Sequence, residues 1–494
     1  MAVSQKDVHI IMIACPGYGH TRPLKAIAKP LINMGYPITF IGAPQFEKMI
    51  ESAGAEFYPL QGSAGFNQDD IEIVFPERKK IAPGPELALH DFEHVFLNPL
   101  GDQHKSIMDI LNRDGLKNKK VVIISDAIIT GTFPILLDAP GRRVPIINVG
   151  SFPLMMMSRD TTPFGVGLPS QGVEANTAMN EGVKQVFAPL TGILERNLKP
   201  FNCKKPLLSD FALDNFYLLP DRFLQLCVPQ LEYPRSDLPS NLRYIGTVTG
   251  SNDKKPQPEW FQSFVVNDTS RPLVFVTSGS LPTMQSSELI EPTLKACADL
   301  PVRVVVCTVA AKLPADFEVP DNARIAEWIS FEELFPHTDL IVSNGGYGTL
   351  GQAFSAGVPM VVGGVTEDKM ECCARAAMTG AAIDLRTQTP SVEQVRDAVV
   401  KVLISREYKR KAVELQEEYK KYDTVAKVVE TIEELTGGST IKSTVEVVKN
   451  GVLEMKKVPA VVVTETPLGS DNADVTVYSV KNGAISSVST LAKA

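Results

Sequence analysis

Long apolar runs, surplus positive charge and regularly spaced cysteines are all missing from this sequence of 494 residues. No apolar stretch approaches the roughly 20 residues that a helix needs to span a membrane, so we expect no transmembrane segment. The formal net charge of -8 provides no basic surface to neutralise the phosphates of a nucleic acid. The seven cysteines form an odd set without metal-ligand spacing, which is typical of a reducing compartment. We therefore expect a cytoplasmic protein that does not bind nucleic acid.

Dinucleotide-binding glycines are missing as well, although the chain opens like an α/β protein. The apolar run His9–Ala14 predicts a first strand, and Cys15–Pro23 predicts a loop ahead of an amphipathic helix. This loop lacks GxGxxG and carries the bulky His20 where a dehydrogenase needs glycine. A histidine at the carboxyl end of a strand stands where ligand crevices form in open α/β sheets. His20 is therefore a candidate site residue, and a solvent-facing loop histidine is the alternative.

A carboxylate is expected beside this histidine. The buried run Val121–Ile124 predicts another parallel strand, and Asp126 follows it at the same edge of the sheet. A carboxylate in this position can fix the tautomer of a histidine base and stabilise its protonated form. The alternative role for Asp126 is to cap the helix that follows.

Glycines directly follow a further buried strand, expected at Asp339–Asn344. Gly345, Gly346 and Gly348 precede a helix of small residues, expected from about residue 349 to residue 356. The unpaired N–H groups and the dipole of such a helix point at one spot, and glycines let a phosphate approach the backbone. The same glycines also suit a turn that is tight for steric reasons alone. The small residues Thr277–Ser280 follow another buried strand and offer the same two interpretations.

A Met-rich segment broken by proline and glycine follows the strand at residues 144–150. Adaptable apolar side chains on a loop suit varied hydrophobic ligands, and interdomain core is the alternative. The candidates for such contacts are Phe152, Met155, Met156 and Met157. His90 and His94 have the i, i+4 spacing of a metal pair, but no HExxH motif or cysteine cluster accompanies them, so we interpret them as helix-surface residues.

The length suits two domains with extensions, and strands alternate with helices along most of the chain. We place the first domain at residues 1–250 and a polar, Pro-rich linker at residues 251–270. The second domain is expected at residues 271–405, and charged amphipathic helices at residues 406–436. Residues 437–494 are rich in Val, Ser, Thr and Lys without a helical period. We expect them to form a flexible tail with short strands at most and no role in catalysis.

The stretch from Trp328 to Lys369 resembles the nucleotide-sugar signature of the UDP-glycosyltransferases. The segment Asn344–Pro359 matches the family's glycine-rich diphosphate segment without a gap, and the spacing from Pro359 to Asp368 is also kept. This family is inverting, and its α/β fold has two facing Rossmann-like domains, the GT-B architecture, with an interdomain cleft. The resemblance implies the same fold here, with the helices of residues 406–436 crossing back to the first domain.

The resemblance also implies roles for single residues. Trp328 stands where the family stacks a tryptophan on uracil, and Asp368 where it holds sugar hydroxyls. His20 stands in the place of the general base, and Asp126 in the place of its partner. The remaining positions that would face the donor are Ser278, Gly279, Ser280, Asn344, Gly345, Gly346, Gly348, Thr349, Gln352 and Lys369.

Three positions differ from the family's pattern. Asn344 replaces a histidine, and Gln352 replaces a glutamate that binds ribose, although both amides can still form hydrogen bonds. Lys369 replaces the usual glutamine beside the sugar. A cation there suits the carboxylate of a uronic acid, contact with a phosphate, or an ion pair with Glu367.

The activity expected from these residues is transfer of a sugar, glucose being favoured, from a UDP-sugar to a hydroxyl of a small lipophilic acceptor. His20 and Asp126 would carry the transfer, with inversion and with no cofactor or metal. One alternative is a nucleotide-sugar-binding protein without turnover, and another is a transferase that uses UDP-glucuronate. Epimerisation of a nucleotide sugar on the same fold is a third.

Overall fold

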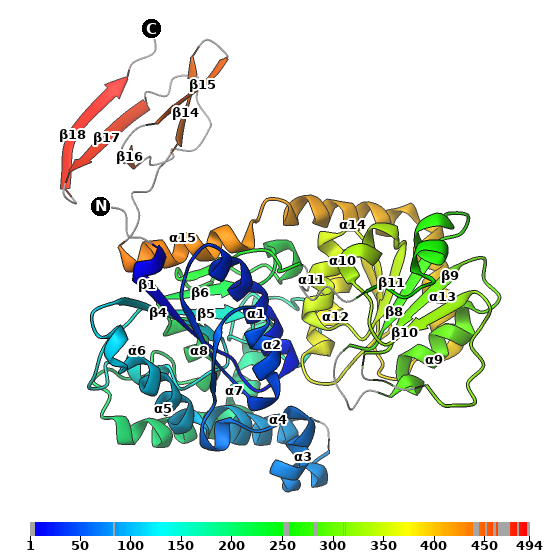
Figure 1. The fold of residues 1–494 in the computed structure, drawn as a ribbon, viewed down its shortest axis with the longest axis horizontal. Coiled ribbons are helices and arrows are strands. Elements are labelled where there is room, and N and C mark those ends of the chain that lie inside the picture. The colour runs from blue at the N-terminus through cyan, green and yellow to red at the C-terminus, as the bar shows by residue number, and fades with distance from the viewer. Residues whose placement is uncertain are drawn as a thin grey trace. The chain divides into compact units, whose positions relative to one another are not determined.

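The computed structural model of the protein contains two parallel β-sheets flanked by helices (Figure 1). It describes residues 5–82, 84–249, 256–279, 285–309, 311 and 313–437, together with the backbone of five strands between residues 444 and 491. Both large sheets lie in one compact unit, Gln5–Ile432. The predicted α/β class is therefore confirmed.

The first sheet has seven strands, all parallel to their neighbours. Its spatial order is β3 (Glu56–Pro59), β2 (Ile38–Gly42), β1 (Val8–Ile13), β4 (Lys120–Asp126), β5 (Ile146–Gly150), β6 (Arg222–Gln225), β7 (Leu242–Tyr244). Every residue of β1 is buried, because helices cover both faces of a parallel sheet. The strand order reverses between β1 and β4, and such a switch point is where ligands bind in open α/β sheets.

The second sheet has six parallel strands. Its spatial order is β10 (Ala323–Ala326), β9 (Arg303–Cys307), β8 (Leu273–Thr277), β11 (Leu340–Ser343), β12 (Met360–Val362), β13 (Ala382–Asp384). Alternate residues of β8 enter different cores: Val274 and Val276 pack in one cluster, and Leu273 and Phe275 in another. The order reverses between β8 and β11, which gives a second switch point.

Helices connect the strands of both sheets. Those of the first part of the chain are α1 (Tyr18–Asn33), α2 (Glu47–Glu51), α3 (Ile71–Val74), α4 (Pro85–Asp91), α5 (Leu100–Leu111), α6 (Phe133–Leu136), α7 (Val173–Leu198) and α8 (Asn215–Leu218). Those of the second part are α9 (Ser286–Cys297), α10 (Phe331–Leu334), α11 (Tyr347–Ser355), α12 (Lys369–Met378), α13 (Val392–Ile404), α14 (Arg406–Tyr419) and α15 (Thr424–Thr436).

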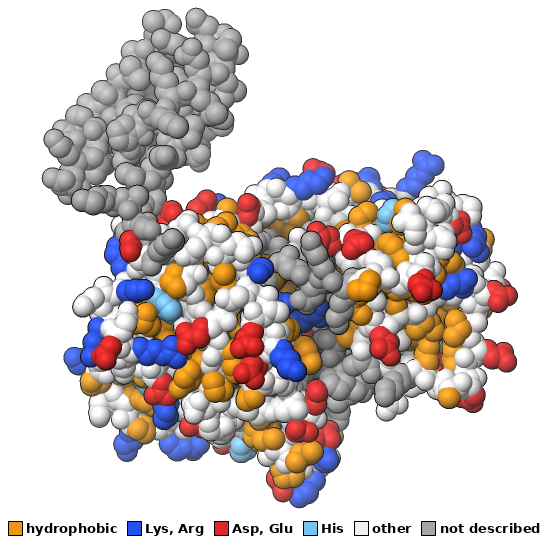
Figure 2. All heavy atoms as spheres, viewed as in Figure 1, with side chains coloured by type: hydrophobic (Ala, Val, Ile, Leu, Met, Phe, Trp, Pro, Cys, Tyr) orange, Lys and Arg blue, Asp and Glu red, His pale blue; other side chains and the backbone are white. Residues whose placement is uncertain are grey.

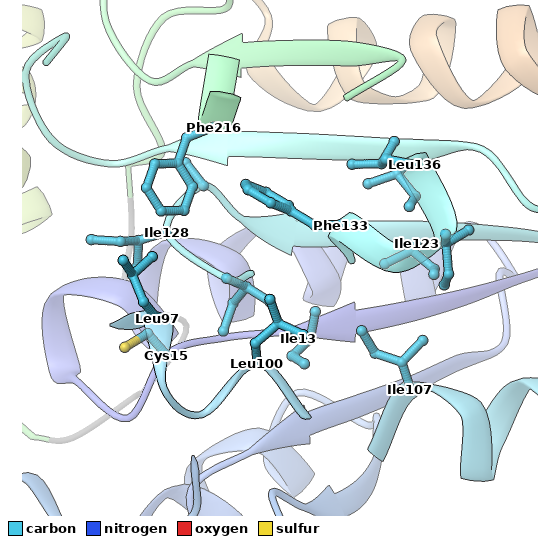
Figure 3. Close-up of a cluster of buried hydrophobic side chains, with 14 of the residues drawn as sticks. Ile13, Cys15, Leu97, Leu100, Ile107, Ile123, Ile128, Phe133, Leu136 and Phe216 are labelled. Carbon is cyan, nitrogen blue, oxygen red and sulfur yellow. The ribbon is translucent and has the colours of Figure 1, made fainter. Parts of the chain in front are cut away.

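The first core lies against β1 and β4 and extends to the edge where both strands end. Figure 3 shows Ile13 and Ile123 from these strands among side chains of α5, with Cys15 and Ile128 lying just beyond the strand ends. Cys15 and Ile128 are almost fully buried. The segments that follow β1 and β4 are thus fixed by apolar packing, which restricts the side chains that they carry.

The chain returns toward the first sheet after α14. Thr424, at the start of α15, donates a hydrogen bond from Oγ1 to the carbonyl of Ile245, at 2.7 Å, and lies 2.9 Å from the carbonyl oxygen of Thr247. Both carbonyls lie just beyond β7. Figure 1 shows α14 beside the second sheet and α15 beside the first. A hydroxyl bonded to two backbone oxygens fixes the start of the last helix.

The C-terminal residues form a separate unit with antiparallel strands. One pair is β14 (Thr444–Lys449) with β15 (Val452–Lys457), and three further strands are β16 (Val461–Val462), β17 (Val475–Lys481) and β18 (Ala484–Leu491). The connections between these strands lie outside the described residues. The expectation of a flexible tail at residues 437–494 falls largely there, and it stays a prediction.

The helix after β1 begins earlier than the sequence predicted. Helix α1 begins at Tyr18, so His20 lies in the first turn of a helix and not in a loop. Pro23 suggested a later start, because proline lacks an N–H group and disrupts helix interiors. Pro23 is the sixth residue of α1, where its missing N–H removes one hydrogen bond and the helix continues beyond it.

No described helix has the length and apolar character that crossing a bilayer requires. On the face drawn in Figure 2, acidic and basic side chains are intermixed and do not form a basic stripe.

Candidate functional site

A cavity of about 640 Å³ is lined by residues from the carboxyl edges of both large sheets. His20 and Phe152 line it from the first sheet, and Gly279, Trp328 and Asp368 from the second. The two switch points, β1/β4 and β8/β11, therefore contribute to one chamber. A parallel sheet gathers polar loop residues at one edge, so two sheets can present two sets of groups to the same ligand.

His20 and Asp126 form a close pair beside this cavity. Nδ1 of His20 lies 2.9 Å from Oδ2 of Asp126, and the histidine side chain is 26% exposed while the aspartate is 1% exposed. The backbone N–H of Cys15 donates to the same Oδ2 at 3.3 Å. Because the carboxylate engages Nδ1, Nε2 is the ring nitrogen left for a ligand. The edge-of-sheet argument thus places these two residues together, as expected.

The charge around His20 favours its protonated form. Burial acts to lower the pKa of the imidazole, but the charge of Asp126, its hydrogen bond and the more distant charge of Asp368 outweigh burial and raise the pKa above 6.5. A histidine with a raised pKa binds the proton that it abstracts more tightly. As the pH falls, its neutral form also becomes protonated at a higher pH than that of an ordinary histidine.

The glycine segment after β11 combines steric and ligand-facing features. Gly345 has φ +81°, and a Cβ built there would lie 2.3 Å from Sγ of Cys373, so glycine is required for packing. Gly346 caps α11 without a side-chain hydrogen bond, and the first turn carries no acidic residue. Gly348 has open space where a Cβ would stand, and it lines the cavity. The N–H groups of this helix start are therefore available to an anion.

Most of the residues implied to face the donor do line the cavity. They are Gly279, Trp328, Asn344, Gly346, Gly348, Thr349, Gln352, Asp368 and Lys369. Ser278 and Gly345 do not line it: Ser278 is fully buried with a hydroxyl that has no partner among the described residues, and Gly345 packs on Cys373. Ser280 lies outside the described residues.

Lys369 forms an ion pair with Glu367, one of the three arrangements that the sequence left open. The lysine side chain is 6% exposed, and Glu367 adopts a left-handed backbone conformation with φ +53°. Burial acts to lower the pKa of Lys369, but Glu367 and Asp368 outweigh it and raise the pKa, so the ammonium stays charged. Its charge is balanced within the protein before any ligand binds.

The Met-rich segment contributes only part of the expected apolar lining. Phe152 and Met155 line the cavity, whereas Met156 and Met157 do not. The carbonyl of Met156 accepts a hydrogen bond from Arg235, and the N–H of Met157 donates to Asp214, so backbone contacts turn this part of the segment away. Sequence reasoning missed several other apolar lining residues, namely Phe66, Phe92, Phe96, Ile128 and Phe164. The i, i+4 spacing of Phe92 and Phe96 was the one signal available.

His90 and His94 lie on consecutive helical turns with ring centroids 4.6 Å apart. His90 Nδ1 lies 3.2 Å from Oδ1 of Asp91, which also pairs with Arg78. Within the described part of the chain, no group of three or more His, Cys, Asp or Glu side chains has the arrangement of a metal site.

Solved structures with the same fold include several glycosyltransferases. The structure of the glycotransferase of kitacinnamycin has a TM-score of 0.65 and 18% sequence identity, and the match covers 86% of this chain and 98% of that one. CalG4, the calicheamicin glycosyltransferase, has a TM-score of 0.61 and 16% identity, and the match covers 87% of this chain and 98% of that one. The fold is therefore the GT-B architecture of two Rossmann-like domains.

Sequence relatives identify the family. The chain is 40% identical over 447 residues to UDP-glycosyltransferase 2 of Phaeomoniella chlamydospora, with 88% of this chain and 97% of the relative covered. It is 31% identical over 432 residues to UDP-glucosyltransferase A1 of Starmerella bombicola, with 86% and 92% covered. The family described as "Erythromycin biosynthesis protein CIII-like, C-terminal domain" matches residues 291–435.

The chain belongs to the UDP-glycosyltransferase family, and it is a transferase that uses a UDP-sugar. This finding confirms the predicted family and enzyme class.

We predict a pH dependence that reports on the histidine. Activity should rise as the pH rises through the pKa of His20, above 6.5, because only the neutral imidazole can accept a proton. Asp126→Asn removes the charge that raises this pKa, so the inflection of kcat/KM should move to lower pH while the plateau falls. An unchanged inflection in Asp126→Asn would contradict the pairing. His337→Gln, a histidine that does not line the cavity, serves as the control.

We also predict that two glycines of the same segment respond differently to alanine. Gly345→Ala should lower the free energy of unfolding by about 1–3 kcal/mol, because a Cβ meets Cys373 at a left-handed φ. Gly348→Ala should leave the protein at least as stable, since the new methyl enters open space in a helix, but it should weaken UDP binding. Thermal unfolding and calorimetry with UDP measure both effects. Equal UDP affinity for Gly348→Ala and the wild type would argue against an anion site here.

Proposed function

We propose that the protein transfers a neutral hexose, with glucose as the favoured sugar, from its UDP derivative to a hydroxyl of a small lipophilic acceptor. The observation that carries the proposal is the shared cavity. A histidine held by a buried carboxylate and a helix start with free N–H groups line the same chamber. A proton acceptor and an anion site on one ligand chamber are what direct displacement of a nucleoside diphosphate needs.

The proposed reaction is a single displacement. Nε2 of His20 accepts the proton of the acceptor hydroxyl as its oxygen forms a bond to the anomeric carbon of the sugar. The bond from that carbon to the phosphate oxygen breaks, and UDP leaves with the electron pair. Asp126 keeps Nδ1 protonated and stabilises the imidazolium. Attack opposite to the leaving group inverts the configuration at the anomeric carbon, and no enzyme nucleophile takes part.

UDP would be bound mainly by preorganised dipoles. The N–H groups after Gly345 and the backbone at Gly279 would face the diphosphate, and the half-buried Trp328 would stack on uracil. Asn344, buried between the turns of β8 and β11, would donate its amide to a phosphate oxygen. These groups meet the charge that develops on the leaving group, so the proposal requires no metal.

The ion pair of Lys369 with Glu367 supports a neutral sugar. A carboxylate on the donor sugar would have to compete with Glu367 for the ammonium and would place two anions beside Asp368. A neutral hexose can instead accept hydrogen bonds from the ammonium and donate hydroxyls to Asp368. Two relatives from Starmerella bombicola carry the name UDP-glucosyltransferase, which agrees with glucose.

The apolar lining of the cavity on the first-domain side supports a lipophilic acceptor. Aromatic and aliphatic side chains surround the approach to His20, and the ring of Phe152 lies 6.2 Å from the imidazole, centroid to centroid. Such surfaces hold flat or extended apolar molecules with little directional constraint.

We predict that His20→Ala separates chemistry from binding. Loss of a general base should lower kcat by a factor of about 10² to 10⁴, while the affinity for UDP stays close to that of the wild type. Steady-state kinetics and calorimetry with UDP measure the two quantities. A variant that turns over at the wild-type rate would show that another group accepts the proton. His104→Ala, which lies outside the cavity lining, controls for nonspecific loss.

Donor choice tests the sugar assignment. UDP release should be acceptor-dependent with UDP-glucose and much slower with UDP-glucuronate, when the enzyme is offered umbelliferone, ergosterol or 12-hydroxystearate. Glu367→Gln frees the ammonium of Lys369 and should raise the relative rate with UDP-glucuronate. Preference of the wild type for UDP-glucuronate would overturn the neutral-sugar proposal. Absence of acceptor-dependent release with every donor would overturn the proposed acceptor class.

A further inference from the structure

Three charged side chains form a buried network between the two sheet domains. Nε of Arg375 lies 2.8 Å from Oε2 of Glu232, and its Nη1 lies 2.5 Å from Oε2 of Glu371. All three side chains are at most 2% exposed. The guanidinium also lies 4.3 Å from the ring centre of Tyr233. Arg375 contacts Oε2 of each carboxylate, and the buried Oε1 atoms require further hydrogen-bond donors.

Those donors come from the loop that follows β5. The N–H groups of Gly165 and Gly167 donate to Oε1 of Glu371 at 2.8 and 2.7 Å. The N–H of Leu154 donates to Oε1 of Glu232 at 3.3 Å. We call residues 152–168 the acceptor loop, since two of its aromatic residues, Phe152 and Phe164, line the cavity. The two buried carboxylates therefore bind this loop near both of its ends.

The same carboxylates also connect to the two helices that carry donor-facing residues, α11 and α12. Tyr347, the first residue of α11, donates from its hydroxyl to Glu232 Oε1 at 3.2 Å. Nε2 of Gln225 lies 2.7 Å from this hydroxyl and 2.7 Å from the carbonyl oxygen of Phe152. Glu371 lies in the first turn of α12, three residues after Asp368. One polar network thus connects both helix starts to the acceptor loop.

Close backbone packing gives the contact further geometric definition. Gly167 has φ +62°, and a Cβ there would lie 2.5 Å from Cγ of Met370, so the loop backbone lies directly against α12. A buried ion network is often no better for stability than apolar residues of similar volume. The network here fixes geometry, because a carboxylate that accepts hydrogen bonds from two backbone N–H groups fixes the position of that backbone.

We propose that Glu371, with Arg375 and Glu232, is a positioning residue that holds the acceptor loop in register with the donor helices. The inference rests on the proposed function, since it assigns the acceptor to the chamber beside this loop. Correct register brings the acceptor hydroxyl between His20 and the anomeric carbon. Glu371 itself touches neither substrate and acts through the loop backbone.

The test compares Glu371→Gln and Glu371→Asp with the wild-type enzyme. Glutamine loses the charge that Arg375 and the two N–H groups share, whereas aspartate keeps the charge but is too short to reach the loop. Asp299→Asn is the matched control, because it removes an exposed carboxylate that also pairs with an arginine, Arg396. Each enzyme is measured by kinetics with UDP-glucose and the acceptors named above, by calorimetry with UDP, and by hydrogen exchange of residues 152–168.

Both Glu371 variants should lose a factor of about 10 to 100 in kcat/KM for the acceptor, with a raised acceptor KM. UDP affinity should be unchanged, and hydrogen exchange should increase in residues 152–168 and not throughout the protein. If Glu371→Gln fails to fold, the same kinetic, calorimetric and hydrogen-exchange measurements on Glu371→Asp decide the test. Unchanged exchange in the loop, or equal losses in UDP and acceptor affinity, would overturn the inference. Failure of the wild type to use any acceptor would reject the proposed function, and loop exchange would still decide whether Glu371 holds the loop.

Discussion

In a parallel sheet every strand ends at the same edge, and this constraint determines where the chemistry of the protein can occur. The strand order reverses between β1 and β4 at one switch point, and between β8 and β11 at another. Asp126 ends β4 and His20 follows β1, while Gly279 and Asn344 follow β8 and β11. The chain therefore forms two polar sites by the same topological means, and one cavity joins them.

The two sites differ in their electrostatic character. The first site contains the buried carboxylate of Asp126. Its negative charge raises the pKa of His20 and makes the histidine a stronger proton acceptor. The second presents the positive end of α11, with no acidic side chain in the first turn. In the proposed reaction, a proton would move toward the first site while a diphosphate leaves toward the second. Under this proposal neither set of groups has to reorganise during the reaction, which is the advantage of preorganised charge.

Sequence patterns predicted those features that depend on local order along the chain. Buried β-branched runs located the strands, and the shared edge of parallel strands predicted the closeness of His20 and Asp126, 106 residues apart, which lie 2.9 Å from each other. The glycine turn has features of both interpretations, a turn that is tight for steric reasons and a turn open to a ligand. Gly345 is needed for packing, and Gly348 faces the cavity.

Features that depend on contacts between distant segments were not predictable in the same way. The orientation of Met156 and Met157 depends on Arg235 and Asp214, which no local pattern connects to them. Likewise, Glu232 and Arg375 belong to different domains, and nothing in the sequence around either residue indicates that they form an ion pair. Three partners were considered for Lys369. Only the structure shows that the partner is Glu367, which has a left-handed backbone conformation.

The stereochemistry of the product tests the central claim most directly, namely that acceptor and donor react by one direct displacement in a shared cavity. UDP-glucose carries its nucleotide in the α configuration, and the anomeric proton of a purified product can be assigned by NMR. The account predicts a β-glucoside as the sole initial product. An α-glucoside would contradict it, because retention requires an enzyme nucleophile or attack from the face of the leaving group.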